Sequence, residues 1–351
     1  MALSIPVTWS DAHRLHAPGT AVWVGVRIDA DELPERAESI RTALEEAGAR
    51  IVPAVPHPDG PLLAVHDVGL VDFLRTAWES WQAGGMPEAS GADEVVGYIY
   101  PTAGLLGGLD PHVPTALSAR TGSWAFDTMT PVGEGTWEAA RAAVDVALTA
   151  ADLVLDGAPA AYACCRPPGH HVTRSAYGGS CYLNNAAVSA QYLRDRGKSR
   201  VAVVDLDAHH GNGAQAIFWD RYDVLTASVH VDPGAGWFPH FLGFGDESGT
   251  ANVNLPLPPG SGDAIWLAAV DRLAATVAEH ESEALVVALG VDAAAGDPNS
   301  PLGVTEDGYR EAGRLLGALD LPTVVVQEGG YVLDTIGMLV RATLEGFEST
   351  R

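Results

Sequence analysis

Apolar and polar positions follow two rhythms along this chain, and together they predict a sheet whose strands are separated by helices. Short runs rich in β-branched residues predict strands at Ala21–Ile28, Ala160–Cys165, Arg200–Asp207, Val224–His230, Ala284–Gly290 and Pro322–Gln327. Stretches in which apolar residues recur every three to four positions predict helices at Pro34–Ala47, Val68–Trp81, Thr136–Leu155, Asn184–Asp195, Asp263–His280, Glu306–Leu319 and Val332–Phe347. This alternation is typical of a parallel sheet covered by helices.

Two of the predicted strands are apolar at consecutive positions instead of every second one. Val201–Val204 and Leu285–Leu289 have no polar residue, so both faces of these strands are expected to be covered. The fold class that we expect is therefore α/β, with three α/β/α layers: a single, mostly parallel sheet with helices on both faces.

The segment from about residue 83 to residue 135 interrupts this pattern. It is rich in Gly, Pro, Ser and Thr, and it predicts a long loop with room for one short helix. Loops of this length within a compact domain are usually functional or interaction insertions. Because no repeat or low-complexity linker is present, the 351 residues are expected to form one domain, 1–351, with an insertion at about 83–135.

The composition excludes several classes of protein. With 47% apolar and 19% charged residues, the chain is expected to be globular. The net charge of −25 and the lack of any Lys/Arg cluster argue against nucleic-acid binding. The charge would attract a cationic substrate or simply keep the protein soluble. No secretory signal and no apolar run of bilayer length is seen, so a cytoplasmic protein without membrane contact is expected. The three cysteines form no zinc-binding CxxC pair and are expected to pack in the core.

Residues with catalytic chemistry follow four of the predicted strands. They lie in Arg166–His171, Asp205–Gly213, at Asp292, and in Glu328–Tyr331. Because open α/β sheets bind ligands at the carboxyl ends of their strands, these side chains are expected to meet at one edge of the sheet.

Asp207, His209 and Asp292 are candidate metal ligands. Asp207 and His209 are two positions apart, so they project to the same face of an extended segment. With Asp292 they offer one imidazole and two carboxylates, a set that leaves a zinc ion an open position for water, as in a hydrolytic site. Taken alone, the Asp-x-His pair is a weak signal and is better explained by a solvated strand end.

His170, His171 and Tyr331 are candidate catalytic groups. The two histidines follow Pro-Pro-Gly, a rigid turn that suits general base and acid work, and Asp205 and Asn212 are candidates to orient them. Tyr331 follows two glycines and is a candidate donor to a developing oxyanion. The alternatives are a polar turn for the histidine pair and a packing role for the tyrosine.

These motifs together resemble the histone deacetylase superfamily, which has the arginase/deacetylase fold. The resemblance rests on RPPGHH at 166–171, GGSCYLNNAA at 178–187, VDLDAHHGNG at 204–213, LGVDAAAGDP at 289–298 and EGGY at 328–331. The stretches at 34–48, 62–74, 135–155 and 238–249 resemble the bacterial acetylpolyamine amidohydrolase branch.

The resemblance implies a role for each matching position. Asp207, His209 and Asp292 would bind zinc, with Fe²⁺ or Co²⁺ as possible substitutes. His171 would be the general base and acid, His170 its neighbour at the reacting water, and Tyr331 the oxyanion donor. Asp205 would be the partner of His170 and Asn212 the partner of His171. A structural K⁺ or Na⁺ would be held at Asp205, Asp207, His209, Ser228 and the backbone oxygen of Val229. Because Asn212 is neutral, the pKa of His171 is expected to be lower than in relatives with Asp.

Two departures from the family pattern concern the substrate. Ser180, next to Gly179, occupies the position at which relatives usually have an aromatic residue that forms one wall of the substrate tunnel. Phe238 matches the aromatic residue of the opposite wall. The loop at 95–110 is mostly apolar where relatives have an Arg-rich, acid-containing insertion. Asp93, Glu94 and Asp110 are the only acids there that could meet a distal ammonium, or they are simply solvated. This loop would also be the contact of a homodimer.

The sequence therefore predicts a zinc-dependent amidohydrolase that acts on a small N-acylated amine, with acetylpolyamine as the leading substrate. The alternatives within the enzyme class are a deacylase of another small molecule with an apolar or aromatic tail, or of acetyl-lysine, and a two-metal, arginase-like hydrolase. A catalytically silent metal-binding sensor is the alternative outside it.

Overall fold

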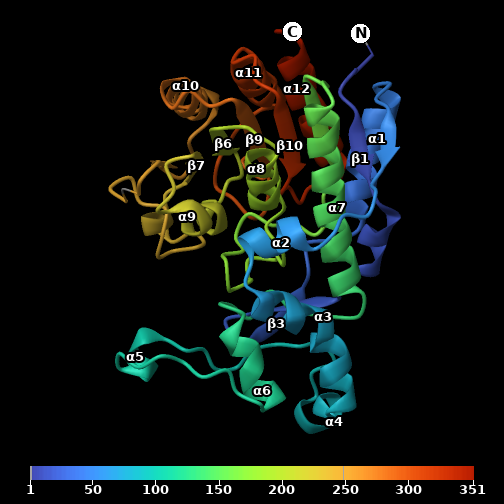
Figure 1. Cartoon of the computed structure of the whole chain (residues 1–351), viewed down its shortest axis with the longest axis vertical. Helices are drawn as coiled ribbons and strands as arrows, with labels where there is room; N and C mark the ends of the chain where they lie inside the picture. Colours follow the sequence, from blue (N-terminus) through green and yellow to red (C-terminus); the bar gives the residue numbers. More distant parts are fainter. Residues whose placement is uncertain (1, 248) are drawn as a thin grey trace.

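An eight-stranded parallel sheet runs through the molecule (Figure 1). The computed structural model describes residues 2–247 and 249–351. The strand order is β4-β1-β5-β10-β9-β6-β7-β8. The strands are β1 (Val7–Trp9), β4 (Ile51–Pro53), β5 (Ala160–Ala163), β6 (Val201–Asp205), β7 (Val224–Val231), β8 (Asn252–Leu257), β9 (Ala284–Leu289) and β10 (Thr323–Gln327). Four adjacent central strands, β5, β10, β9 and β6, are those that precede the candidate catalytic residues.

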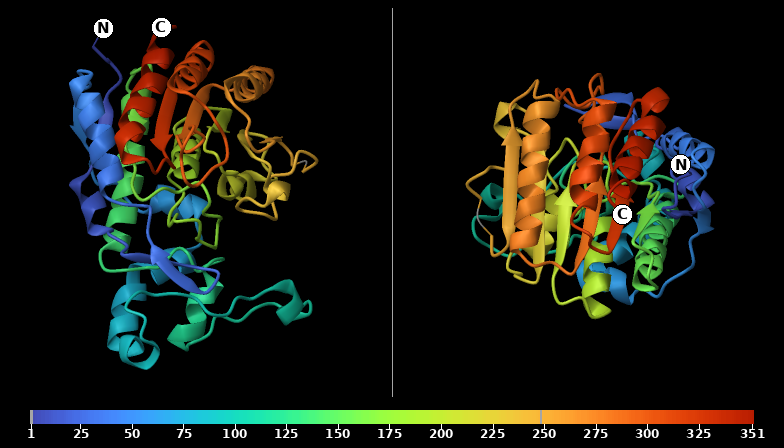
Figure 2. Two further views of the ribbon diagram at one scale, coloured as in Figure 1. Left: turned by 180° about the vertical axis from the view of Figure 1, so that it is seen from behind. Right: turned by 90° about the horizontal axis from the view of Figure 1, so that it is seen from above.

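Helices cover both faces of the sheet, as the view from above shows (Figure 2). One face packs against α1 (Glu35–Glu46), α10 (Asp263–Glu279), α11 (Glu306–Gly317) and α12 (Leu333–Glu348). The other packs against α2 (Gly60–Val65), α3 (Val68–Ala83), α7 (Thr136–Leu155), α8 (Asn185–Asp195) and α9 (Asn212–Phe218). The expected three-layer α/β/α fold is confirmed, and all seven predicted helices are present.

The central strands alternate between the two cores. In β6, Ala202 and Val204 face the core beneath α10, whereas Val201 and Val203 face the core beneath α8. These side chains are at most 1% exposed. Because each face meets a different helical layer, neither face tolerates a polar residue, which explains the uninterrupted apolar runs in the sequence.

The predicted strand Ala21–Ile28 is wrong as a member of this sheet. The chain instead forms a separate antiparallel hairpin, β2 (Thr20–Trp23) and β3 (Val26–Asp29). Val24 and Gly25 both have positive φ, 49° and 76°, as a two-residue hairpin turn requires. Because Gly25 permits this turn, the apolar run folds back on itself.

The sequence patterns missed three strands and two helices that cover the sheet. β1 and β4 have only three residues each, too few for a periodicity. β8 contains Pro256 and lies at the edge of the sheet, where proline is tolerated. α2 and α9 are short, with six and seven residues.

The segment at 83–135 has more structure than the single short helix that the sequence allowed. It contains α4 (Met86–Ser90), α5 (Ala103–Leu106) and α6 (Leu117–Arg120). A bridge between Val95 and Val132 ties its two ends together. The part around α5 extends away from the rest of the molecule as an arm (Figures 1 and 2).

The two ends of the described chain lie side by side, at the side of the sheet opposite to the arm (Figure 1). The backbone N–H groups of Ser4 and Ile5 both donate to the Glu348 carboxylate, at 2.6 and 2.8 Å. Within the described ranges, no helix combines the length and the apolar character needed to cross a bilayer.

Candidate metal and catalytic centre

The candidate residues come together where the central strands end. His170 and His171 follow β5, Glu328 and Tyr331 follow β10, Asp292 follows β9, and Asp207 and His209 follow β6. A cavity of about 430 Å³ opens over this edge, and His171, His209 and Tyr331 line it. The prediction that the motifs meet at one edge of the sheet is confirmed.

Asp207, His209 and Asp292 form a compact group whose possible ligand atoms all lie within 4.8 Å of one another. The Nδ1 atom of His209 is 3.2 Å from Asp207 Oδ1 and 3.0 Å from Asp292 Oδ2. The other oxygen of each carboxylate accepts a backbone hydrogen bond. Asp207 accepts from the Gly329 N–H and Asp292 from the Ala208 N–H, both at 2.8 Å. These contacts fix the direction of the three side chains.

Gly329 lets the backbone approach this group closely. A Cβ atom at this position would lie 2.5 Å from Asp207 Oδ2 and 2.7 Å from Asp292 Oδ2. Any side chain would therefore displace the two carboxylates, which explains a glycine at the end of β10.

The two buried carboxylates of this group favour the binding of a cation. Burial and the neighbouring carboxylate of Asp207 raise the pKa of Asp292. Burial lowers the pKa of His209, but its hydrogen bonds to Asp207 and Asp292 outweigh this and raise it. Two buried carboxylates this close need positive charge between them. One imidazole and two carboxylates are a donor set that suits a zinc-like divalent ion, so the residues present fit such a metal.

The two adjacent imidazoles have different partners. His170 Nδ1 is 2.9 Å from Asp205 Oδ2, and His171 Nδ1 is 2.7 Å from Asn212 Oδ1, so both expected partners are in place. Burial lowers the pKa of His170, but the carboxylates of Asp207 and Asp205 outweigh this and raise it. Burial and the neighbouring His170 lower the pKa of His171. One ring therefore favours the charged form and the other the neutral form, although their centroids are only 3.9 Å apart.

Tyr331 is held by Arg36, a residue that the sequence analysis did not single out. Arg36 donates to the carbonyl oxygens of Gly330 and Glu328 at 2.5 and 2.6 Å, and its guanidinium lies 4.8 Å from the Tyr331 ring centroid. Burial raises the pKa of Tyr331, so its hydroxyl remains a donor. The sequence signal for Arg36 is a charge among the core-facing positions of α1, where it is 2% exposed.

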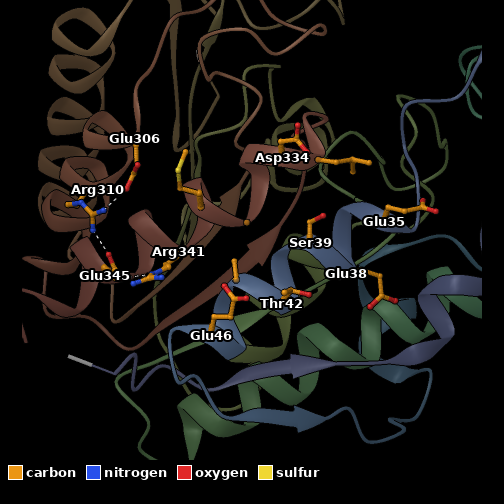
Figure 3. A pocket seen from close by; sticks show the side chains of 14 residues that line it. Glu35, Glu38, Ser39, Thr42, Glu46, Glu306, Arg310, Asp334, Arg341 and Glu345 are labelled. Atoms are coloured by element: carbon orange, nitrogen blue, oxygen red, sulfur yellow. Dashed lines mark hydrogen bonds and ion pairs between the residues drawn. The ribbon is translucent and has the colours of Figure 1, made fainter.

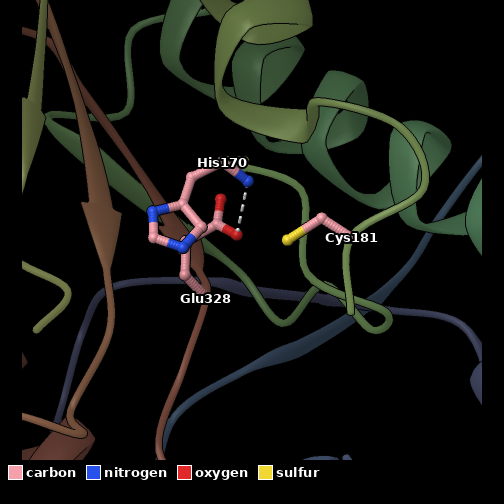
Figure 4. A group of neighbouring side chains, drawn as sticks. All are labelled: His170, Cys181 and Glu328. Atoms are coloured by element: carbon pink, nitrogen blue, oxygen red, sulfur yellow. Dashed lines mark hydrogen bonds between the residues drawn. The ribbon is translucent and has the colours of Figure 1, made fainter. Parts of the chain in front are cut away.

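Glu328 is a second residue whose role the sequence did not reveal (Figure 4). Its Oε2 atom accepts hydrogen bonds from the backbone N–H groups of Gly169 and His170, at 2.6 and 3.1 Å. Glu328 thereby fastens the turn that carries both histidines to the strand that carries Tyr331.

Cys181 lies beside Glu328 and His170, within the distance of a further possible ligand group. Burial raises the pKa of the Cys181 thiol well above its usual range. His170 Nδ1 already faces Asp205, and Glu328 Oε2 already accepts two N–H groups. Cys181 is therefore assigned as a packing partner of His170 and Glu328, and this group is not assigned as a metal site.

Three of the five residues named for a monovalent cation lie on the neighbouring strands β6 and β7, and Asp207 and His209 follow β6. Asp205 of β6 is directly opposite Ser228 of β7, and Val229 follows it. Asp205 Oδ1 accepts the N–H of Asp207 at 3.0 Å, and Ser228 Oγ lies 2.8 Å from His230 Nδ1.

Of the four residues predicted to contact the substrate, Gly179, Ser180 and Phe238 line the cavity. Asp110 is not among the lining residues and is exposed on the arm. Gly179 and Ser180 are held from the segment at 83–135: the Gly179 N–H donates to Asp127 at 2.6 Å and the Ser180 N–H to Thr130 at 2.8 Å. The ring of Phe238 lies edge-on to His171 with centroids 4.7 Å apart.

The cavity has one wall that the sequence analysis missed. The β2–β3 hairpin and the residues after it contribute Ala21, Trp23, Ile28, Asp29 and Asp31 to the lining. The signal that could have found this wall was Gly25, a turn residue in the middle of the apolar run.

A larger hollow of about 720 Å³ lies between α1, α11 and α12 (Figure 3). It is lined mainly by charged residues that pair with one another: Arg310 bonds to Glu306 at 2.8 Å and also to Glu345, and Arg341 bonds to Glu345 at 2.7 Å. None of the histidine and aspartate residues at the sheet edge lines it. The catalytic chemistry is therefore assigned to the smaller cavity.

Comparison with known proteins gives a consistent result over the whole chain. A family described as "Histone deacetylase domain" matches residues 30–347. Acetylpolyamine amidohydrolase 1 of Pseudomonas aeruginosa is 40% identical over 97% of this chain and 98% of its own length. Acetylpolyamine amidohydrolase of Mycoplana ramosa is 38% identical over 97% of this chain and 98% of its own length. The crystal structure of an acetylpolyamine aminohydrolase from Burkholderia pseudomallei superimposes with a TM-score of 0.93, at 41% identity, over 99% of this chain and 100% of that one.

Proposed function

This chain belongs to the histone deacetylase family, and from that premise we propose that it is a metal-dependent amidohydrolase that removes an acetyl group from a small N-acylated amine. The single observation that carries the proposal is the convergence of Asp207, His209 and Asp292 with His171 and Tyr331 at one cavity. The relatives named as acetylpolyamine amidohydrolases make an acetylpolyamine the leading substrate.

The metal that we propose is one zinc ion per chain, held by Asp207, His209 and Asp292, with Fe²⁺ or Co²⁺ as substitutes. When bound, such an ion polarises the acyl carbonyl and lowers the pKa of a water molecule. A structural K⁺ or Na⁺ is proposed at Asp205, Asp207, His209, Ser228 and Val229. The side-by-side placement of Asp205 and Ser228 supports this second site.

His171 is the proposed general base and acid. Because Asn212 Oδ1 accepts the Nδ1–H, the Nε2 atom is left as the basic nitrogen. Its lowered pKa keeps the ring neutral and able to take a proton from the attacking water. The same nitrogen then returns this proton to the leaving nitrogen, so the C–N bond breaks to give a neutral amine and a carboxylic acid. The acid then passes its remaining proton to the amine, which gives carboxylate and ammonium.

His170 and Tyr331 stabilise the charges that develop around this step. His170, with its raised pKa and its bond to Asp205, is a cationic donor beside the water. Tyr331 donates its hydroxyl hydrogen to the carbonyl oxygen as negative charge develops there. Arg36 and Glu328 are positioning residues, since they hold the Tyr331 loop and the histidine turn.

The test is a panel of N-acyl amines with the zinc-loaded protein. We expect hydrolysis of short linear N-acetyl amines, measured as release of acetate and free amine. Absence of turnover on every member would contradict the proposed function.

A second substrate class is an amine with an apolar or aromatic tail. Ser180 in the cavity wall favours it, because a small side chain leaves more room than an aromatic wall does. Turnover of N-acetylputrescine compared with that of an aromatic N-acetyl amine separates the two classes.

We also propose that residues 1–351 act as one catalytic domain and that the chain forms a homodimer through the arm. The support is the apolar surface of the arm: Tyr98, Leu105 and Leu109 are 71%, 62% and 76% exposed. Apolar clusters of this kind are usually covered by a partner.

A further inference from the structure

We propose that the β2–β3 hairpin selects the amine end of the substrate, binding a methylene chain with Trp23 and Ile28 and a terminal ammonium with Asp29 and Asp31. This inference rests on the proposed function, because it concerns the part of an N-acyl amine that does not react. It assigns recognition of the chain and of the distal ammonium, which the proposed function leaves open, to this hairpin.

One face of the hairpin forms an apolar wall of the catalytic cavity. Ala21 pairs with Ile28, and Trp23 is two residues further along the same strand, so the three side chains share one face. All three line the cavity, whereas Val22 and Arg27 of the opposite face do not. Trp23 and Ile28 are 57% and 40% exposed, so an apolar chain bound there would cover surface that now faces water.

The end of this wall carries negative charge. Asp29 and Asp31 both line the cavity and are exposed, and the Asp31 carboxylate has only a long contact, 3.4 Å, with Asn299. The cavity lining contains no lysine or arginine among the residues that the structure describes. A cationic group that reaches this end of the cavity therefore meets carboxylates that no lysine or arginine of the described lining compensates.

A buried carboxylate lies beside these two residues. Glu32 lines the cavity and is 3% exposed. Arg36 and Arg166 hold its Oε1 atom at 2.6 and 2.9 Å, but its Oε2 atom accepts no hydrogen bond from any described residue. The Nε2 atom of His16 lies 3.6 Å from this oxygen, so Glu32 belongs to the buried wall behind the two aspartates and its charge faces three basic side chains.

Hydrogen bonds to the segment at 83–135 hold the hairpin in place, which a wall that discriminates between substrates requires. The Thr128 hydroxyl donates to the Val22 carbonyl at 2.7 Å, and Arg27 donates to the Gly91 carbonyl at 3.1 Å. Both contacts come from the segment at 83–135, so this segment positions the wall without lining it at these points.

The experiment compares two substrates of equal length with the zinc-loaded protein. N-acetylputrescine ends in an ammonium, and N-pentylacetamide has a methyl group in its place. We expect the wild type to prefer N-acetylputrescine in kcat/KM. In the double variant Asp29→Asn/Asp31→Asn, we expect KM for N-acetylputrescine to rise about fivefold, with kcat and the constants for N-pentylacetamide unchanged, since exposed charge pairs contribute up to about 1 kcal/mol each.

Trp23 is tested on both substrates. Because its contact is with methylene groups, Trp23→Ala should raise KM for both by a similar factor of about five, and Trp23→Phe should restore most of the loss. Asp271→Asn, an exposed position on α10, is the matched charge control and should change neither substrate.

Two results would overturn the hairpin proposal: a wild type that prefers N-pentylacetamide, or an aspartate double variant that changes both substrates equally or neither. Calorimetric titration of both amides separates this from failure of the proposed function. Preferential binding of N-acetylputrescine that is lost in the double variant, without turnover, would support the hairpin's role and contradict catalysis. Turnover without this selectivity would support the proposed function and contradict the role of the hairpin.

Discussion

The Nδ1 atom of His171 lies 2.7 Å from the side-chain oxygen of Asn212. Asn212 is fixed in turn, because its Nδ2 atom donates to the His171 carbonyl at 3.2 Å. This reciprocal pair sets the tautomer of the ring without supplying a charge. It is a neutral orienting partner in a place where His170, the adjacent imidazole, has the carboxylate of Asp205.

Replacing Asn212 by Asp should therefore move the pH dependence of the reaction. A carboxylate beside Nδ1 favours the imidazolium, so Asn212→Asp should raise the pKa of His171. Because the base must be neutral to act, the loss of activity on acidification should begin at a higher pH in the variant than in the wild type. We expect the acidic limb of the kcat/KM profile to move up by about one to two pH units. An unchanged limb, or one that moves down, would contradict the assigned role of His171.

His171→Ala and Tyr331→Phe should each remove most of the activity. Loss of a general base and of an oxyanion donor typically costs about 10² to 10⁴ and about 10² to 10³ in rate, respectively. Circular dichroism and metal content should stay at wild-type values, since neither residue is a proposed ligand. Activity near wild type in either variant, with the fold intact, would rule out the mechanism.

Metal removal should abolish turnover, and one equivalent of Zn²⁺ per chain should restore it. In the metal-free protein, protons compete for the same site because the pKa values of Asp292 and His209 are both raised. Metal affinity should therefore fall as the pH is lowered, by about tenfold per pH unit for each proton displaced. Asp292→Asn should weaken binding by at least about 100-fold. A stoichiometry of two metals per chain would instead favour an arginase-like site.

His66 should make the fold sensitive to acid. It is 1% exposed, donates from Nδ1 to the Thr173 carbonyl, and accepts the Asn184 N–H at Nε2, each at 2.9 Å. Burial lowers its pKa to about 4, below the value of 6.5 expected in the unfolded chain. The neutral ring's contribution is therefore complete above pH 6.5 and is lost as the pH falls toward 4, with a total of a few kcal/mol at about 1.4 kcal/mol per pH unit.

Urea unfolding of the wild type and of His66→Gln at a series of pH values measures this effect. The variant should be less stable at neutral pH and should show a shallower loss of stability between pH 6.5 and 4. His112→Gln, at an exposed position on the arm, is the matched control. Parallel pH curves for the wild type and His66→Gln would show that His66 does not titrate in this range.

The arm should control the oligomeric state. Placing charge on its apolar surface with Leu105→Asp/Leu109→Asp would leave two carboxylates per chain without partners in the proposed interface. We expect sedimentation to show a dimer for the wild type and a monomer for the variant. An exposed pair elsewhere, Asp271→Asn/Met338→Ala, should leave the assembly unchanged. A wild type that sediments as a monomer would refute the proposed interface.

The central part of this site was predictable because the necessary signals are local. Buried parallel strands produce uninterrupted apolar runs, and the residues that follow them must meet at one edge. This reasoning placed Asp207, His209 and Asp292 at that edge, and the resemblance to a known family supplied their proposed role as metal ligands.

The parts that were not predictable depend on contacts between distant segments. In the sequence, Arg36 is one charged residue on an amphipathic helix. Its role depends on the fold, which brings the Gly330 carbonyl, 294 residues away in the chain, against its side chain. Glu328 was part of a recognised motif, but its bond to the His170 N–H crosses 158 residues. The prediction for the hairpin segment was wrong for another reason, because a strand pattern alone does not show which sheet a strand joins.

The adjacency of the two chain ends has a practical consequence. Ser4 and Ile5 are tied to Glu348, and both ends emerge on the side of the sheet away from the hairpin and the arm (Figure 1). A fused domain or a surface anchor at either end would thus leave the cavity mouth clear. A short peptide joining the old ends would also suit circular permutation, with new ends opened in an exposed turn such as that after α8.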